Sequence, residues 1–168
     1  DAVAEFFNGA RFDSAVLNRL QACHRLHGKG VLVIGDSHAI DLYRIISQTG
    51  SAPFVLAVVE GGCRPHTPAR DCPYDAIRSF VAAHPALFDL ILFEQAGFYL
   101  LSSPGYPEGS RRMFSELGLH APVPTLTINT GRIDLVRAYL AALADYVPVV
   151  WFGPRPEPHM PLDAILRI

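Results

Sequence analysis

The sequence has little of several features that mark particular classes of protein. Lysine occurs once, at Lys29, only 18% of the 168 residues are charged, and the formal net charge is −2. This balance excludes a basic nucleic-acid-binding face. Half of the residues are hydrophobic, which excludes intrinsic disorder. No apolar run reaches the roughly 18 residues of a membrane-spanning helix, so we expect no transmembrane segment in this chain.

Two kinds of ligand-binding pattern are also missing. The chain contains neither GxGxxG nor GxxxxGK, the glycine-rich loops that bind phosphate groups. It contains no CxxC pair and no Cys/His grouping at the spacing of metal ligands. We therefore expect no cofactor and no metal ion.

Cysteine is scarce, with only Cys23, Cys63 and Cys72 in the chain. Cys63 and Cys72 are nine positions apart in a stretch rich in proline and glycine. A disulfide that closes this loop would stabilise the fold by about 2–3 kcal/mol and would indicate an oxidising compartment. The alternative is two unrelated thiols. We expect Cys23 to pack as a small hydrophobic residue.

Short apolar runs alternate along the chain with stretches of helical periodicity. Strands that are buried on both faces of a parallel sheet have this composition, and the alternation predicts right-handed βαβ units. The expected strands cover residues 31–34, 54–59, 90–93 and 148–152, and the expected helices cover residues 14–27, 39–49, 74–83 and 131–146. We predict a single α/β domain over residues 1–168. It would have three layers, α/β/α, with helices on both faces of a central, mostly parallel sheet.

The residues that follow the predicted strands are the first candidates for a functional site, because ligands of open α/β sheets bind at the carboxyl ends of the strands. The most informative of these segments is Gly35-Asp36-Ser37-His38-Ala39, which joins a strand to a helix. Ser37 would present its hydroxyl at the sheet edge and its N–H at a helix N-terminus, as a nucleophile and oxyanion donor require. Asp and Ser are also preferred N-cap residues, so an ordinary helix start fits equally well.

The stretch from Val31 to Ala39 resembles the first block of the SGNH, or GDSL-like, hydrolase superfamily. It is most similar to the SGNH domains that are associated with membrane acyltransferase-3 proteins, in which GDSHA follows a hydrophobic strand. The resemblance covers roughly residues 29–154 and includes Cys63-Arg64-Pro65 and a nearby second cysteine, Cys72. It implies the flavodoxin-like fold of the superfamily and a Cys63–Cys72 disulfide.

The resemblance also implies a function. That function is O-acetyl transfer to hydroxyls of a bacterial cell-surface carbohydrate through a serine acyl-enzyme. The donor would be a membrane acyltransferase-3 module and the acceptor a glycan. The reaction would take place in the periplasm or elsewhere outside the cytoplasm, in a protein that is free or membrane-anchored. One alternative is a carbohydrate or lipid acetylesterase, and another is a non-catalytic glycan-binding or scaffold module.

Four residues take roles from the resemblance. Ser37 would be the nucleophile, and its N–H would be one oxyanion donor. Gly62 matches the second-block glycine, whose N–H is another donor, and Gly61 is a close alternative. Gln95 stands where the superfamily has an asparagine and would offer its side-chain amide.

The Asp-x-x-His block that supplies the superfamily's catalytic base is absent from the sequence. We expect the chain to end before this block, so that the domain is incomplete at its C-terminus. The alternative is a base within the chain, for which His159 is the best candidate and Asp163 could orient it. We expect His38 to line the site and His66 to lie near its rim.

Three aromatic residues follow the third predicted strand, namely Phe98, Tyr99 and Tyr106. They could stack against a sugar ring or cover the apolar edge of the sheet. The sequence leaves both interpretations open.

Overall fold

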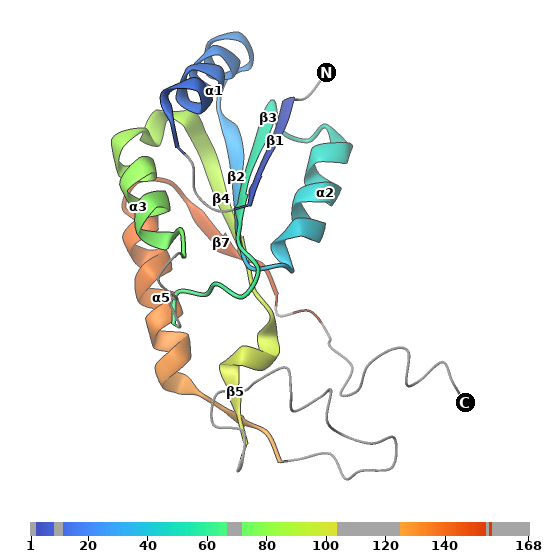
Figure 1. Cartoon of the computed structure of the whole chain (residues 1–168), viewed down its shortest axis with the longest axis vertical. Helices are drawn as coiled ribbons and strands as arrows, with labels where there is room; N and C mark the ends of the chain where they lie inside the picture. Colours follow the sequence, from blue (N-terminus) through green and yellow to red (C-terminus); the bar gives the residue numbers. More distant parts are fainter. Residues whose placement is uncertain (1–2, 9–11, 67–71, 104–124, 154, 156–168) are drawn as a thin grey trace, which may run out of the picture.

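The computed structural model describes residues 3–8, 12–66, 72–103, 125–153 and 155, which form an α/β domain (Figure 1). The main sheet has five parallel strands in the order β1-β3-β2-β4-β7. These strands are β1 (Val3–Asn8), β2 (Gly30–Gly35), β3 (Phe54–Val59), β4 (Phe88–Glu94) and β7 (Val149–Trp151). The helices are α1 (Ser14–His27), α2 (Ala39–Thr49), α3 (Tyr74–Ala83) and α5 (Thr130–Ala144), with short 3-10 segments η1 (Pro85–Leu87) and η2 (Gly97–Leu100).

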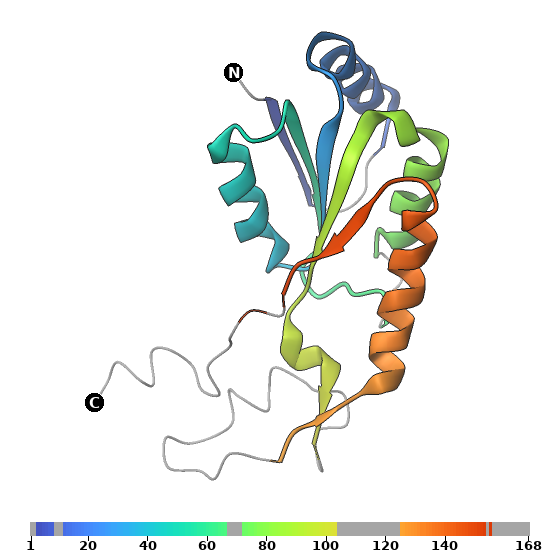
Figure 2. The ribbon, with the colours of Figure 1, turned by 180° about the vertical axis from the view of Figure 1, so that it is seen from behind.

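Helices cover both faces of this sheet (Figures 1 and 2). Helices α1, α3 and α5 pack on one face, against a core that includes Leu32, Leu56 and Ile91. Helix α2 packs on the other face, against Val33 and Ala57. Consecutive residues of β2 and β3 belong to different cores because successive side chains of a strand point to opposite faces. The three-layer α/β/α fold predicted from the sequence is confirmed.

The sheet has one strand more than the four predicted from the sequence. Strand β1 lies at the edge beside β3, in register from Val3 opposite Phe54 to Asn8 opposite Val59. Its sequence, Val-Ala-Glu-Phe-Phe-Asn, lacks the continuous apolar run of the predicted strands. An edge strand pairs on one side only, so it requires less of that pattern.

A second, two-stranded sheet joins the residues on either side of positions 103–126. Strands β5 (Leu101–Ser102) and β6 (Thr127–Ile128) pair in antiparallel fashion. The Asn129 N–H donates to the Leu100 carbonyl at 2.8 Å, and Asn129 Nδ2 donates to Ser102 Oγ at 3.0 Å. The two ends of the segment are therefore held together immediately before α5.

The order of the strands determines where a ligand can bind. Strand β2 is central, with β3 on one side and β4 on the other. The strands after β2 are therefore added first on one side of it and then on the other. The order β3-β2-β4-β7 corresponds to the first four strands of flavodoxin-like folds, which bind ligands at this switch point. The segments after β2, β3 and β4 therefore meet at one edge of the sheet. In the described part of the chain, no helix is both long enough and apolar enough to cross a membrane.

Candidate active site

Ser37 lies in the tight turn between β2 and α2. Gly35 ends the strand with φ +151°, and a Cβ atom there would come within 1.8 Å of the Glu94 carbonyl oxygen. Only glycine allows β2 to approach β4 so closely at this point. Helix α2 begins at Ala39, and Ser37 is exposed just before it. Within the described residues, neither the Ser37 hydroxyl nor its N–H has a hydrogen-bond partner.

The neighbouring Asp36, and not Ser37, stabilises the turn. Its side chain is fully buried, and its Oδ1 accepts a hydrogen bond from the His38 N–H at 3.0 Å. Its Oδ2 accepts from the Ala96 N–H at 3.0 Å, which joins the turn to the segment after β4. Because the aspartate satisfies the local backbone donors, the serine hydroxyl is left available for chemistry.

The segment after β3 provides two more backbone donors. Glu60 to Cys63 forms a turn in which the Cys63 N–H donates to the Glu60 carbonyl at 3.2 Å. Gly62 occupies its third position with φ +84°, a conformation that favours glycine. A Cβ atom on Gly61 or Gly62 would meet nothing within 4 Å. No acceptor among the described residues bonds the N–H of either glycine, so both donors are available to a ligand.

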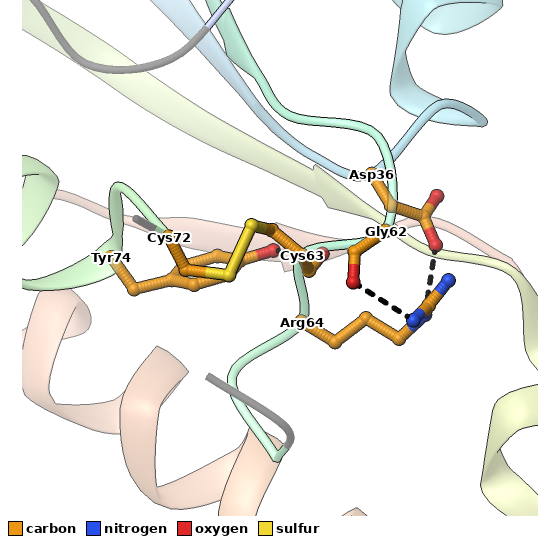
Figure 3. The surroundings of a disulfide bond; sticks show 6 residues. All are labelled: Asp36, Gly62, Cys63, Arg64, Cys72 and Tyr74. Carbon is orange, nitrogen blue, oxygen red and sulfur yellow. Dashed lines mark hydrogen bonds and ion pairs between the residues drawn. A yellow bond between two sulfur atoms is a disulfide. The ribbon is translucent and has the colours of Figure 1, made fainter. Parts of the chain in front are cut away.

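A disulfide holds this segment against α3 (Figure 3). Cys63 and Cys72 are bonded, with their Cα atoms 5.4 Å apart, and the disulfide expected from the resemblance is confirmed. The buried Tyr74 hydroxyl donates to the Cys63 carbonyl at 2.9 Å. The Tyr139 hydroxyl in turn donates to the Tyr74 carbonyl at 3.0 Å. The backbone next to Gly62 is therefore supported from both α3 and α5.

These segments surround a pocket of about 510 Å³ at the carboxyl edge of the sheet. The residues that line it come from the ends of three neighbouring strands. They are Ser37, His38, Gly61, Gly62, Arg64, Ala96, Phe98 and Tyr99. The structure thus brings together the predicted nucleophile, the predicted glycine donor with its alternative, and two of the three aromatic residues.

The other predicted site residues lie elsewhere or outside the described residues. Gln95 is 1% exposed and does not line the pocket. His159, Asp163 and Tyr106 lie outside the described residues. The roles predicted for Gln95, His159 and Asp163 therefore stay predictions.

His66 is buried and does not lie on the rim of the pocket. Burial, together with the positive charges of Arg132 and Arg64, lowers the pKa of His66 to about 4. Its imidazole is therefore neutral at pH 7.

Two arginines that the sequence did not single out connect the parts of the site. Arg64 lies within the pocket wall and forms an ion pair with Asp36, with Nε and Oδ2 3.2 Å apart. Arg155, beyond β7, donates from Nη2 to the His38 carbonyl at 3.1 Å. Its Nε lies 2.5 Å from Oε1 of Glu94, a buried carboxylate at the end of β4. Burial raises the pKa of Glu94, and the Arg155 charge opposes this increase. The contacts of Arg64 and Arg155 could not be predicted from the sequence, because single arginines outside helices and strands belong to no periodic pattern.

The chemistry available in the pocket is that of a serine hydroxyl beside unpaired backbone N–H groups. Over the described part of the chain, no three His, Cys, Asp or Glu side chains gather where they could hold a metal ion. An exposed hydroxyl at the start of a helix, in the same pocket as N–H donors that can bind an oxyanion, is an arrangement suited to acyl transfer.

Comparison with known proteins identifies the family. A family model for the SGNH domain, fused to AT3 (acyltransferase-3) domains, matches residues 8–167. No curated protein and no solved structure matches the chain. The family match covers the strands that carry the pocket, the pocket itself and the disulfide segment. The chain therefore belongs to the family of SGNH domains that are fused to AT3 domains.

Proposed function

We propose that this domain transfers acetyl groups to hydroxyls of a bacterial cell-surface carbohydrate through an acetyl ester on Ser37. The observation that carries the proposal is the position of Ser37 in the pocket. Its hydroxyl has no partner among the described residues, and the N–H groups of Ser37, Gly61 and Gly62 lie around the same pocket without acceptors in that part of the chain. Each well-placed oxyanion donor contributes about 10²–10³-fold to the rate of acyl transfer.

The reaction has two balanced steps. In the first, Ser37 Oγ attacks the carbonyl carbon of the donor's acetyl group, a base takes the serine proton, and the donor's leaving group departs with a proton. In the second, a glycan hydroxyl attacks the acetyl-serine, gives up its proton to the base, and leaves as the acetyl ester while Ser37 regains its proton. The N–H groups of Ser37 and Gly62 would hold the negative oxygen in both steps.

Of the two possibilities that the sequence leaves for the base, we propose the one within this chain, His159 oriented by Asp163; a base supplied from beyond this chain is the alternative. Arg155 is anchored by its hydrogen bond to the His38 carbonyl, next to the nucleophile. His159 follows Arg155 by four residues, a span of at most about 14 Å in an extended chain. This short separation from Arg155 in the sequence supports the choice of His159. A serine without such a base is a poor nucleophile at neutral pH.

The family and the disulfide support our proposal for the acetyl donor and the compartment. Because SGNH domains of this family are fused to AT3 domains, we assign the supply of acetyl groups to a membrane acyltransferase-3 module. The Cys63–Cys72 disulfide favours an oxidising compartment, and we place the domain outside the cytoplasm.

Intact-mass labelling with a fluorophosphonate tests the nucleophile. We expect one adduct on the wild-type chain and none on Ser37→Ala. Ser47→Ala is the matched control, because Ser47 lies in α2, which follows the turn, and does not line the pocket. This variant should label like the wild type. An adduct that persists in Ser37→Ala would refute the assignment. His159→Ala should slow labelling about 10²–10⁴-fold if His159 is the base.

A second assay separates transfer from hydrolysis and from binding alone. The protein is supplied with p-nitrophenyl acetate, with and without an oligosaccharide acceptor, and the products are followed by mass spectrometry. Acetylated oligosaccharide that depends on Ser37 supports the proposal. Acetate alone would indicate an acetylesterase. Saccharide binding without turnover or labelling would indicate a non-catalytic glycan-binding module.

A further inference from the structure

We propose that Arg64 is a positioning residue that fixes the Gly61-Gly62 turn in the orientation needed to bind the oxyanion. The inference rests on the proposed function, because it assigns the role of a residue in the same pocket. Arg64 is 7% exposed and lies directly after the disulfide cysteine Cys63. It neither supplies nor accepts the acetyl group in this role.

The guanidinium of Arg64 contacts three separate walls of the pocket. Its Nε lies 3.2 Å from Oδ2 of Asp36, in the nucleophile turn (Figure 3). Its Nη1 donates to the Gly62 carbonyl at 3.1 Å. Its Cζ lies 3.1 Å from the centroid of the Tyr99 ring, in the segment after β4. One side chain thus connects the segments that follow β2, β3 and β4.

This connection restricts a turn whose two glycines allow a wide range of backbone angles. Glycine has the widest range of φ and ψ, so two consecutive glycines do not fix the direction of their own N–H groups. Arg64 holds the Gly62 carbonyl, and Tyr74 holds the next carbonyl, that of Cys63, at 2.9 Å. With two successive carbonyls held, the peptide planes on either side of Cys63 are fixed. At the other end of the turn, the Glu60 N–H donates to the Gly35 carbonyl at 3.2 Å and the Glu60 carbonyl accepts from the Cys63 N–H at 3.2 Å. Gly61 and Gly62 therefore lie between two anchored ends, which restricts the directions that their N–H groups can take.

The contacts require the shape of an arginine as well as its charge. The planar fork places Nε on Asp36 and Nη1 on Gly62 at the same time, while the face of the group stacks on Tyr99. A lysine would still neutralise the buried Asp36 carboxylate, but one ammonium group cannot occupy all three positions. A positioning role and a purely charge-balancing role therefore predict different results for Arg64→Lys.

The test uses Arg64→Lys and Arg64→Met, with Arg78→Met as the matched control. Arg78 also pairs with an aspartate, Asp75 at 3.0 Å, but on the exposed surface of α3. For p-nitrophenyl acetate hydrolysis or transfer, we expect kcat to fall about 10–100-fold in both Arg64 variants, because displacement of a catalytic group by about 1 Å has an effect of this size. KM should change little, and Arg78→Met should keep the wild-type kcat. Thermal unfolding confirms that Arg64→Lys, which keeps the charge, is folded.

Nuclear magnetic resonance relaxation of the Gly61 and Gly62 amides tests the same inference without any turnover. Their order parameters should fall from the range of rigid backbone, about 0.85, towards that of flexible loops, below about 0.6, in Arg64→Lys. Unchanged order parameters, or a wild-type kcat in Arg64→Lys, would overturn the positioning role. If the wild type shows no Ser37-dependent reaction, the proposed function fails, and the relaxation measurement still decides whether Arg64 fixes the turn.

Discussion

The Tyr74 hydroxyl donates a hydrogen bond to the carbonyl oxygen of Cys63 at 2.9 Å, so the first residue of α3 holds the backbone that follows the candidate oxyanion glycines. Tyr74 is 5% exposed, and the Tyr139 ring meets it edge-on, with ring centroids 5.1 Å apart. The hydroxyl of Tyr139 then donates to the Tyr74 carbonyl. Two helices on one face of the sheet thus support a loop that belongs to its carboxyl edge.

The tyrosine pair predicts a loss of stability at high pH. Burial raises the pKa of Tyr74 well above 10, and burial also raises the pKa of Tyr139. In the unfolded chain both phenols lose their protons near pH 10, so unfolding becomes more favourable as the pH rises above 10. Urea unfolding between pH 7 and 11 should show this loss, and Tyr74→Phe should reduce it.

At pH 7 the same substitution should destabilise the fold. Tyr74→Phe removes the hydrogen bond to Cys63 and should lower the free energy of unfolding by about 1–3 kcal/mol. Tyr146→Phe is the control, because Tyr146 is 49% exposed and should leave both measurements unchanged. A Tyr74→Phe variant with the wild-type alkaline profile would contradict the assignment.

Loss of the Cys63–Cys72 disulfide should affect both stability and the pocket. The bond joins cysteines nine positions apart, and its removal in Cys63→Ser/Cys72→Ser should cost about 2–3 kcal/mol of unfolding free energy. Because Cys63 adjoins Gly62, we also expect slower fluorophosphonate labelling of Ser37. Cys23→Ser is the control, since Cys23 is a free cysteine. Equal labelling rates for all three proteins would show that the bond does not influence the pocket.

Gly35 should tolerate no side chain. In Gly35→Ala the new Cβ would overlap the Glu94 carbonyl oxygen at 1.8 Å, so β2 and β4 must separate at the nucleophile turn. We expect a loss of about 3 kcal/mol in urea unfolding. Gly50→Ala is the matched control: Gly50 also has a positive φ, +63°, but a Cβ there meets nothing within 4 Å. Gly50→Ala should lower the free energy of unfolding by only about 1 kcal/mol.

The buried His66 predicts a loss of stability at acid pH. Its pKa of about 4 in the folded state lies below the 6.5 of an ordinary histidine, so the unfolded chain binds the extra proton between pH 6.5 and 4. Stability therefore falls with falling pH through this window, by at most about 1.4 kcal/mol for each pH unit. His66→Gln should flatten the dependence, whereas His27→Gln, on the exposed end of α1, should retain it. Parallel pH profiles for His66→Gln and the wild type would rule this out.

The main elements of the fold were predictable because their apolar patterns are strong. The predicted helices over residues 14–27, 39–49 and 74–83 and the strand over 54–59 have the bounds seen in the structure. The strand predicted over 148–152 is shorter, Val149–Trp151. The helix predicted over 131–146 begins one residue earlier and ends two residues earlier, at Thr130–Ala144. Strands β5 and β6 have two residues each, too few to produce a recognisable period. Their pairing depends on contacts between distant segments of the chain.

The site was predictable where a turn required particular residues. Ser37 and Gly62 lie two and three residues beyond the ends of β2 and β3, and the topology brings those strand ends together. The direction of a side chain at a strand end depends on register, which explains why Gln95 could be placed after β4 but not oriented. The contacts of Arg64 and Arg155 join segments that are far apart in sequence, so no local sequence pattern predicts them.

The clamp formed by β5, β6 and Asn129 makes the intervening segment a suitable place for engineering. Because its two ends are already fixed beside each other, a change in its length leaves α5 and the sheet in place. Each doubling of the length of a connection between two fixed points costs only about 0.6 kcal/mol of closure entropy. An affinity module inserted between residues 104 and 124 should therefore leave fluorophosphonate labelling of Ser37 at the wild-type rate.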